Sequence, residues 1–265
     1  MRQFLSQEVL KEKVPSIFQT KADAAVSDRY SFVPTNELLS NFEQAGWLPV
    51  EAKQVRAYKH DPEFGKHMIR LAPSDRFDLK EFKVGDLEPE IMVLNSHNRS
   101  SKLLVELALY RKVCMNGLMV ADSAFSKVNV RHMSFNFADI LEIISKALSE
   151  FNLVYNKIDE YKNIMLTQNE RNDFAGSVIN MVWDGRKFTP SQILNPRREE
   201  DRNEDLFSTF NIIQENVMRG GMVFKTKKGQ KKSRSIRSIN GEVTINKNLW
   251  LMMEAFRTTK TFAMS

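Results

Sequence analysis

The sequence predicts an α+β fold, in which an antiparallel or mixed sheet over about residues 30–133 is backed by long helices. Up to residue 133, apolar residues occur in short alternating runs separated by turn-forming residues, which is typical of strands. From residue 136 they recur every three or four positions, which is typical of helices. A third pattern, a basic stretch over residues 219–237, predicts a loop or hairpin within the helical C-terminal part.

These patterns divide the chain into an N-terminal segment (1–33), a sheet-rich part (34–135) and a helical part (136–265) that carries the basic segment. A chain of 265 residues has room for one large domain or two small ones, and we expect one integrated domain. Apolar residues make up 42% of the chain, which is enough for a sizeable core.

The composition also indicates a compartment. The single cysteine, Cys114, cannot form an internal disulfide, which fits a reducing environment. No apolar run reaches the length of a membrane span, and charges interrupt the N-terminal stretch, unlike in a signal peptide. We therefore expect a soluble intracellular protein with no membrane partner.

The first 33 residues are expected to be loosely structured or helical, with the apolar run VPSIF as an anchor. Residues 30–33 alternate as a short strand would. Pro34-Thr35-Asn36 then begins a helix, whose apolar residues recur at helical spacing until Gly46 ends it.

With residues 30–33 included, the pattern up to residue 133 predicts a sheet of five or six strands. The stretch 102–114 fits either a strand or a short helix, and Asn116-Gly117 is a turn signal between apolar flanks. The other strands are predicted at residues 47–58, 67–72, 90–96, 118–120 and 125–133.

A long helix is predicted over about residues 139–166, with Asn136 as its N-cap. An apolar seam runs along it, and we favour a helix that lies across the sheet over a coiled coil. A second helix is predicted over about residues 168–183. The seam consists of Phe137, Leu141, Ile144, Leu148, Phe151, Tyr155, Ile158 and Met165.

Residues 195–250 organise the C-terminal part. The charged run at 198–205 is interpreted as a salt-bridged helix start, where Asp205 caps a helix that ends at Gly220-Gly221. Gly229 predicts a flexible turn, such as the tip of a hairpin. Asn240-Gly241 predicts a tight turn before a final helix that starts at residue 249.

The basic stretch carries the strongest functional signal. It has eight basic residues and no acidic one, so removing their charges from the formal net charge of +6 leaves −2 (6 − 8). Such a concentration is typical of a phosphate-backbone site. The alternative is a solvated loop that keeps the protein soluble. The eight residues are Arg219, Lys225, Lys227, Lys228, Lys231, Lys232, Arg234 and Arg237.

A second basic face is expected on the sheet. Its candidate residues are Arg56, Arg70, Arg111, Lys112 and Arg131. Single-strand binding adds aromatic side chains on which bases stack. Within the basic stretch Phe224 is the one aromatic residue, and Trp47, Tyr58 and Tyr110 on the sheet could supply others or belong to the core.

The sequence gives little sign of catalysis or of a cofactor. The four histidines, His60, His67, His97 and His132, lack metal-ligand spacing, and no phosphate-binding GxxxxGK motif is present. His97 lies in a polar turn without the orienting group and oxyanion hole of a catalytic pair, so we interpret it as turn-stabilising. We expect no metal, no cofactor and no enzymatic activity, with a metal-dependent nuclease as the enzymatic alternative.

Several separate motifs resemble, in order, a prophage- and plasmid-borne protein family that includes YfjQ and YafZ. The family pattern of GW, KHMVR, NSHDGSS, VCSNGL, NRVQENLIRGG, a basic RTRAI-type stretch and LNRALW has counterparts over about residues 28–256. Asn98-Arg99 replaces the Asp-Gly of the third motif, which should weaken that turn. The motifs read here Gly46-Trp47, Lys66-His67-Met68-Ile69-Arg70, Asn95-Ser96-His97, Cys114-Met115-Asn116-Gly117-Leu118, Gln214-Glu215-Asn216, Arg219-Gly220-Gly221 and 246–250.

The resemblance implies a mobile-element protein in the cytoplasm of a bacterial host and carries over no activity. The order of predicted elements is also similar to that of phage single-strand annealing proteins of the Redβ/RecT type, which by analogy implies a ring or filament of identical subunits. We therefore expect a non-catalytic protein that binds nucleic acid, preferably single-stranded DNA, in recombination or replication. The alternative is an interaction protein that inhibits or decoys a host defence or regulatory protein. Its basic run would then bind an acidic surface of that partner.

Overall fold

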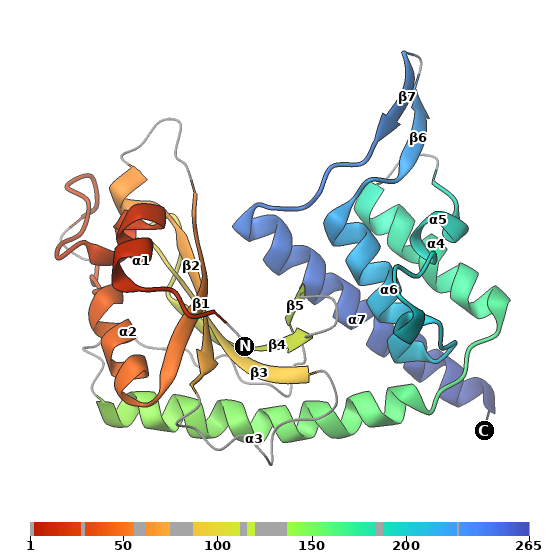
Figure 1. The fold of residues 1–265 in the computed structure, drawn as a ribbon, viewed down its shortest axis with the longest axis horizontal. Coiled ribbons are helices and arrows are strands. Elements are labelled where there is room, and N and C mark those ends of the chain that lie inside the picture. The colour runs from red at the N-terminus through yellow and green to blue at the C-terminus, as the bar shows by residue number, and fades with distance from the viewer. Residues whose placement is uncertain are drawn as a thin grey trace. The chain divides into compact units, whose positions relative to one another are not determined.

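The structure is a computed structural model that describes residues 3–27, 30–55, 62–74, 87–111, 116–119, 137–183, 188–226 and 228–264. The chain forms two compact units (Figure 1). Unit 1 comprises Met1–Leu118 and Ser123–Asn152, and unit 2 comprises Met119–Asp122 and Leu153–Ser265. The boundary between the units lies inside a helix, at residue 152.

Unit 1 is built on a five-stranded sheet, which confirms the predicted α+β class. The strands lie in chain order, and each neighbouring pair from β1 to β4 is antiparallel. β3 is buried on both faces, which explains its continuous apolar run. The strands are β1 (Trp47–Gln54), β2 (His67–Pro73), β3 (Leu87–Asn95), β4 (Leu104–Arg111) and β5 (Asn116–Met119).

Short helices cover the β1 side of the sheet. α1 (Gln7–Lys13), the 3-10 helix η1 (Pro15–Phe18) and α2 (Thr35–Gln44) all pack near β1. The predicted VPSIF anchor is confirmed, because Val14 and Ile17 are fully buried. The predicted strand at residues 30–33 is wrong, since this segment is extended without a ladder partner. It is held instead by Tyr30, whose hydroxyl donates to the Ser96 carbonyl at 2.6 Å.

Two histidines lie at the centre of a buried polar cluster in unit 1. Their ring centroids are 5.1 Å apart, with His67 at the start of β2 and His97 just after β3. Thr35 Oγ1 lies 2.9 Å from His67 Nε2 and 3.3 Å from His97 Nε2. Ser16 Oγ lies 2.9 Å from His67 Nδ1, and Asn95 donates to Thr35 Oγ1 at 3.0 Å. The cluster therefore joins the N-terminal segment, α2 and two strands.

The predicted long helix is α3 (Phe137–Lys162), which runs from unit 1 into unit 2. Its buried stripe is shifted from the predicted seam, since Leu141 and Met165 are 47% and 60% exposed. From Ile140 to Tyr161 the stripe advances by alternating steps of four and three residues, the same spacing as the predicted seam but on a neighbouring face of the helix. It consists of Ile140, Ile143, Ile144, Ala147, Phe151, Val154, Ile158 and Tyr161.

Unit 2 packs helices around α6 (Leu206–Arg219), which is buried on almost every side. Asp205 caps this helix as predicted, accepting from the Ser208 amide at 2.7 Å. A two-stranded hairpin of β6 (Val223–Thr226) and β7 (Gly229–Lys232) follows it (Figure 1). The other helices are α4 (Gln168–Trp183), α5 (Pro190–Ile193) and α7 (Ile239–Met264).

Two predicted turns are part of regular elements. Asn116-Gly117 lies within β5. Asn240-Gly241 lies in the first turn of α7, which begins ten residues earlier than predicted, at Ile239 rather than 249. The physical reason for this early start is Ser238, whose hydroxyl accepts from the Gly241 amide at 3.1 Å and caps the helix.

The predicted strand at 125–133 and the N-cap Asn136 lie outside the described residues. Within the parts of the chain that the structure describes, no helix has the length and apolarity needed to cross a membrane.

The histidine cluster predicts a pH-dependent stability. Burial lowers the pKa of His67 to about 3, with a further contribution from neighbouring His97, and burial lowers the pKa of His97 to about 4. In the unfolded chain the pKa of both histidines is about 6.5. At a pH between the folded and the unfolded pKa, the unfolded chain binds more protons than the folded chain, so stability falls as the pH drops below about 6.5. Denaturant unfolding at pH 5 should give a free energy lower than at pH 7 by about 2 kcal/mol per histidine.

The ring signals of both histidines, followed by nuclear magnetic resonance, provide the direct check. They should stay those of neutral imidazole down to pH 5. Titration of either ring near pH 6.5 would contradict the buried cluster.

Candidate functional site

The polar residues of α6 carry the geometry of the candidate site. Gln214, Glu215 and Asn216 are polar, yet they lie in the centre of unit 2 and each is at most 4% exposed. Buried polar groups require partners, and these three reach different segments. Gln214 donates to the Asn246 side-chain oxygen of α7 at 2.8 Å, which ties two family-like motifs together.

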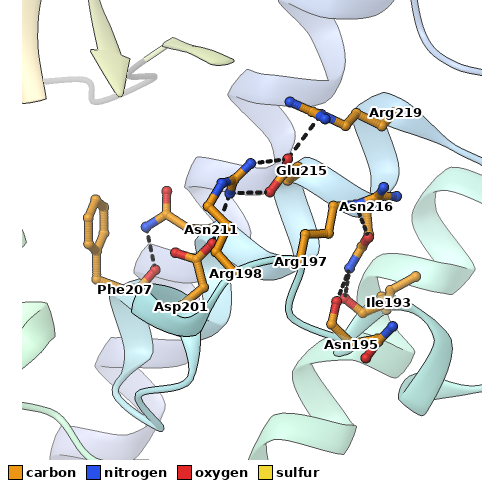
Figure 2. A network of polar contacts seen from close by, with 10 residues as sticks. All are labelled: Ile193, Asn195, Arg197, Arg198, Asp201, Phe207, Asn211, Glu215, Asn216 and Arg219. Carbon is orange, nitrogen blue, oxygen red and sulfur yellow. Dashed lines mark hydrogen bonds and ion pairs between the residues drawn. The ribbon is translucent and has the colours of Figure 1, made fainter. Parts of the chain in front are cut away.

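Glu215 lies at the centre of an ion cluster (Figure 2). Arg198 donates to both of its carboxylate oxygens, at 2.6 and 2.5 Å, and Arg219 Nε lies 3.0 Å from Oε1. Arg198 also pairs with Asp201 at 3.0 Å. The hydrogen bonds from Arg198 to Glu215 raise the pKa of the Arg198 guanidinium, so this guanidinium stays charged. The cluster holds the 3-10 helix η4 (Glu199–Asp201) against the C-terminal half of α6.

Asn216 fixes the chain on the other side of α6 (Figure 2). Its amide nitrogen donates to the carbonyls of Ile193 and Asn195, at 2.9 Å each. Its oxygen accepts from Arg197 Nε at 2.8 Å, and Arg197 in turn donates to the Gly220 carbonyl at 3.3 Å. Adjacent residues of α6 therefore bind adjacent arginines, and both contacts lie at the base of the hairpin.

A glycine turn leads from α6 into the hairpin. Gly220 has φ of 65°, and a Cβ there would lie 2.7 Å from the Arg234 carbonyl carbon and oxygen. Only glycine fits both the conformation and the close approach. The Gly221 amide donates to the Ser233 carbonyl at 2.9 Å, and the Ser233 amide donates to the Met222 carbonyl at 2.8 Å. The outgoing and returning chains are thus joined at the root of the hairpin.

The hairpin presents its lysines on both faces. Thr226 pairs with Gly229 at the tip, which confirms the predicted position of the turn. Because side chains alternate along a strand, Lys225 and Lys232 share one face, and Lys231 shares the other face with Phe224.

The predicted basic residues differ in their surroundings. Arg219 is paired with Glu215, and Lys227 lies outside the described residues. The other six are exposed, and among described residues none of the six lies within ion-pair distance of a carboxylate. They are Lys225, Lys228, Lys231, Lys232, Arg234 and Arg237.

Aromatic side chains pack against the hairpin strand β6. The ring centroid of Phe224 lies 5.3 Å from that of Phe188, which lies 4.8 Å from that of Trp183 at the end of α4. Phe188 and Trp183 are buried, whereas Phe224 is half-buried. A row of three aromatic rings therefore runs from β6 to α4.

The second basic face on the sheet has one described side chain. Arg70 donates to Glu51 at 2.7 Å and to the buried Glu90 at 2.5 Å, so its charge is compensated within the sheet. The backbone of Arg111 lies in β4, but its side chain is outside the described part of the chain. Outside it lie also the whole residues Arg56, Lys112 and Arg131.

His97 is a structural residue, in line with its interpretation as turn-stabilising. Its ring is fully buried, its amide donates to the Phe64 carbonyl at 2.9 Å, and its carbonyl accepts from Asp23.

Sequence reasoning missed the roles of Arg197 and Arg198. Arg198 belongs to the charged run at 198–205, which is interpreted as a salt-bridged helix start, and its local pairs are present, such as Arg202 with Glu199 at 3.0 Å. Arg197 lies just before that run. The pairing of Arg198 with Glu215 spans 17 residues and is invisible to local periodicity. The available signal was the Gln214-Glu215-Asn216 motif, because charged and amide side chains on the buried face of a helix demand partners.

A pair of charge-removing variants tests the ion cluster. Glu215→Gln should lower the free energy of unfolding by about 3–5 kcal/mol, since it removes the buried carboxylate that pairs with the largely buried Arg198. The matched control Glu199→Gln removes the exposed pair with Arg202 and should cost about 0–1 kcal/mol. Denaturant unfolding of both variants measures the difference, and equal effects would contradict the central position of Glu215.

Comparison with known proteins agrees with the motif resemblance. Residues 23–250 match the family described as "Domain of unknown function (DUF932)". The UPF0380 proteins YafZ and YfjQ of Escherichia coli (strain K12) are each 34% identical over 260 residues, covering 96% of this chain and 92% of theirs. No solved structure matches the chain. The predicted relationship is confirmed, and the chain belongs to the UPF0380/DUF932 family.

Proposed function

We propose that this chain is a non-catalytic nucleic-acid-binding protein of a phage or plasmid, and that it binds single-stranded DNA in recombination or replication. The observation that carries the proposal is the group of six exposed basic side chains on and beside the hairpin, for which the described residues supply no carboxylate.

The hairpin concentrates like charge at an energetic cost. Lys225 and Lys232 lie diagonally on one face of a two-stranded ribbon, where like charges repel. An isolated two-stranded hairpin is only marginally stable, so this repulsion opposes its folding. A phosphate backbone would neutralise the lysines and release counterions, which converts the repulsion into affinity.

The root of the hairpin makes this charge a defined surface. Three features hold the two ends of the hairpin against α6. They are the Gly220-Gly221 turn, the backbone hydrogen bonds of Ser233 to Gly221 and Met222, and the hydrogen bond from Arg197 to the Gly220 carbonyl. The cations are therefore presented by a fixed element rather than by a flexible loop, which distinguishes a binding surface from a solubilising one.

A single strand is favoured because aromatic surface accompanies the charge. Phe224 is half-buried and shares its face of the hairpin with Lys231. A ring beside a cation offers a base a stacking surface next to a phosphate contact, and bases in a duplex are already stacked. A protein of this kind would coat or anneal DNA strands of its mobile element.

Replacing four hairpin lysines tests the proposal. The variant Lys225→Ala, Lys228→Ala, Lys231→Ala, Lys232→Ala should bind a labelled single-stranded oligonucleotide at least about tenfold more weakly at low salt. The dependence of log affinity on log salt should become shallower by about 3, because each lost phosphate contact on a single strand contributes about 0.7.

A charge-matched control separates the hairpin from net charge. Lys13, Lys21, Lys102 and Lys146 are also exposed, and replacing them by alanine lowers the net charge by the same four units, from +6 to +2. This control should keep the wild-type affinity and salt dependence. Wild-type-like binding by the hairpin variant would overturn the assignment. Failure of the wild-type protein to bind any nucleic acid would instead favour an acidic protein partner for the hairpin.

A further inference from the structure

An open pocket lies in unit 2 beside the root of the hairpin. Its volume is about 610 Å³, which is within the range of sites that hold small organic ligands. It is formed by the end of α4, the segment that returns from β7, and the first two turns of α7.

The pocket has an apolar side and a polar side. Val182, Trp183 and Ile245 provide apolar and aromatic surface. Ser235, Arg237 and Ser238 provide two hydroxyls and an exposed guanidinium. Among the described residues that line the pocket, none carries a carboxylate.

These surfaces fit an anionic ligand with a flat aromatic group. The indole and the aliphatic side chains suit the face of a nucleobase, and a guanidinium with neighbouring hydroxyls suits a phosphate. Gly241 allows the segment before α7 to pack closely on the helix, because a Cβ there would lie 2.7 Å from Ser238 Oγ and 2.9 Å from Ile236 Cγ2.

The pocket is continuous with the basic hairpin. Trp183 belongs to the aromatic row that reaches Phe224 of β6 through Phe188. In the segment that follows β7, Arg234 and Arg237 extend the line of basic residues from the hairpin to the pocket. A strand bound along the hairpin therefore has a cationic path to the pocket.

We infer that this pocket holds one nucleotide of a bound single strand, with its base against Trp183 and its phosphate at Arg237 and the two serines. The inference rests on the proposed function and deepens it. The hairpin supplies affinity for any phosphate backbone, and the pocket supplies the preference for single strands. A duplex would have to break a base pair and unstack the base to fill the pocket, which costs a few kcal/mol.

A pocket-filling variant tests the inference without changing charge. Ser235→Phe should lower affinity for single-stranded DNA by about tenfold, the effect of losing one stacked base, and leave duplex affinity and the salt dependence unchanged. Ser177→Phe is the matched control, since Ser177 is exposed on α4 and does not line the pocket. Thermal unfolding verifies that both variants fold. Arg237→Gln, at an exposed position, removes one phosphate contact, so it should weaken single-strand binding and make the salt dependence shallower by about 0.7.

Tryptophan fluorescence gives an independent readout. Of the three tryptophans, Trp47 and Trp250 are fully buried, and Trp183 lines the pocket. Single-stranded oligonucleotide should quench the wild-type and Ser177→Phe proteins, whereas Ser235→Phe should lose the quenching.

The outcomes separate the two proposals. Single-strand and duplex affinities that are equal in the wild type, or unchanged in Ser235→Phe and Arg237→Gln, would overturn the pocket and leave the hairpin assignment standing. An equal loss of single-strand and duplex affinity in Ser235→Phe would also overturn it. Loss of binding to all nucleic acids in the wild type would overturn the proposed function itself.

Discussion

The structure of unit 2 depends on one buried carboxylate. Glu215 is about as buried as the apolar residues around it, and a charge in that position is tolerable only with complete partners. Arg198 and Arg219 provide them from different segments. This requirement fixes η4 against α6 and places the end of α6, and with it the glycine turn, in one position. The hairpin starts from this turn, so the turn sets the direction of the hairpin relative to α6.

Unit 1 follows the same logic with neutral groups. His67 and His97 share Thr35 through their ring nitrogens, and Ser16 completes the hydrogen bonding of His67. Burial keeps both rings neutral, so no counter-ion is needed. In both units, described residues of the family motifs make buried polar contacts between distant segments.

The hairpin contrasts with these paired interior charges. Ion pairs inside both units compensate the charges of Arg70, Arg198 and Arg219, so positive charge is concentrated where the described chain offers no partner. In the proposed function, stability in the interior and affinity at the surface therefore depend on different arginines and lysines. The open pocket beside the hairpin adds aromatic surface at the same place.

The sequence by itself determined the features that local physics controls. Periodicity gave the strands and the helices α2, α3 and α4, the caps at Asp205 and Gly220-Gly221 bounded α6, and Gly229 marked the hairpin tip. Tertiary structure decided the rest, because it depends on residues far apart in the chain. Arg198 finds Glu215 across 17 residues, the capping by Ser238 and the burial of Ile239 extend α7 through an apparent turn, and the pocket joins α4 to α7. No local pattern encodes such contacts, since each exists only once the segments have packed.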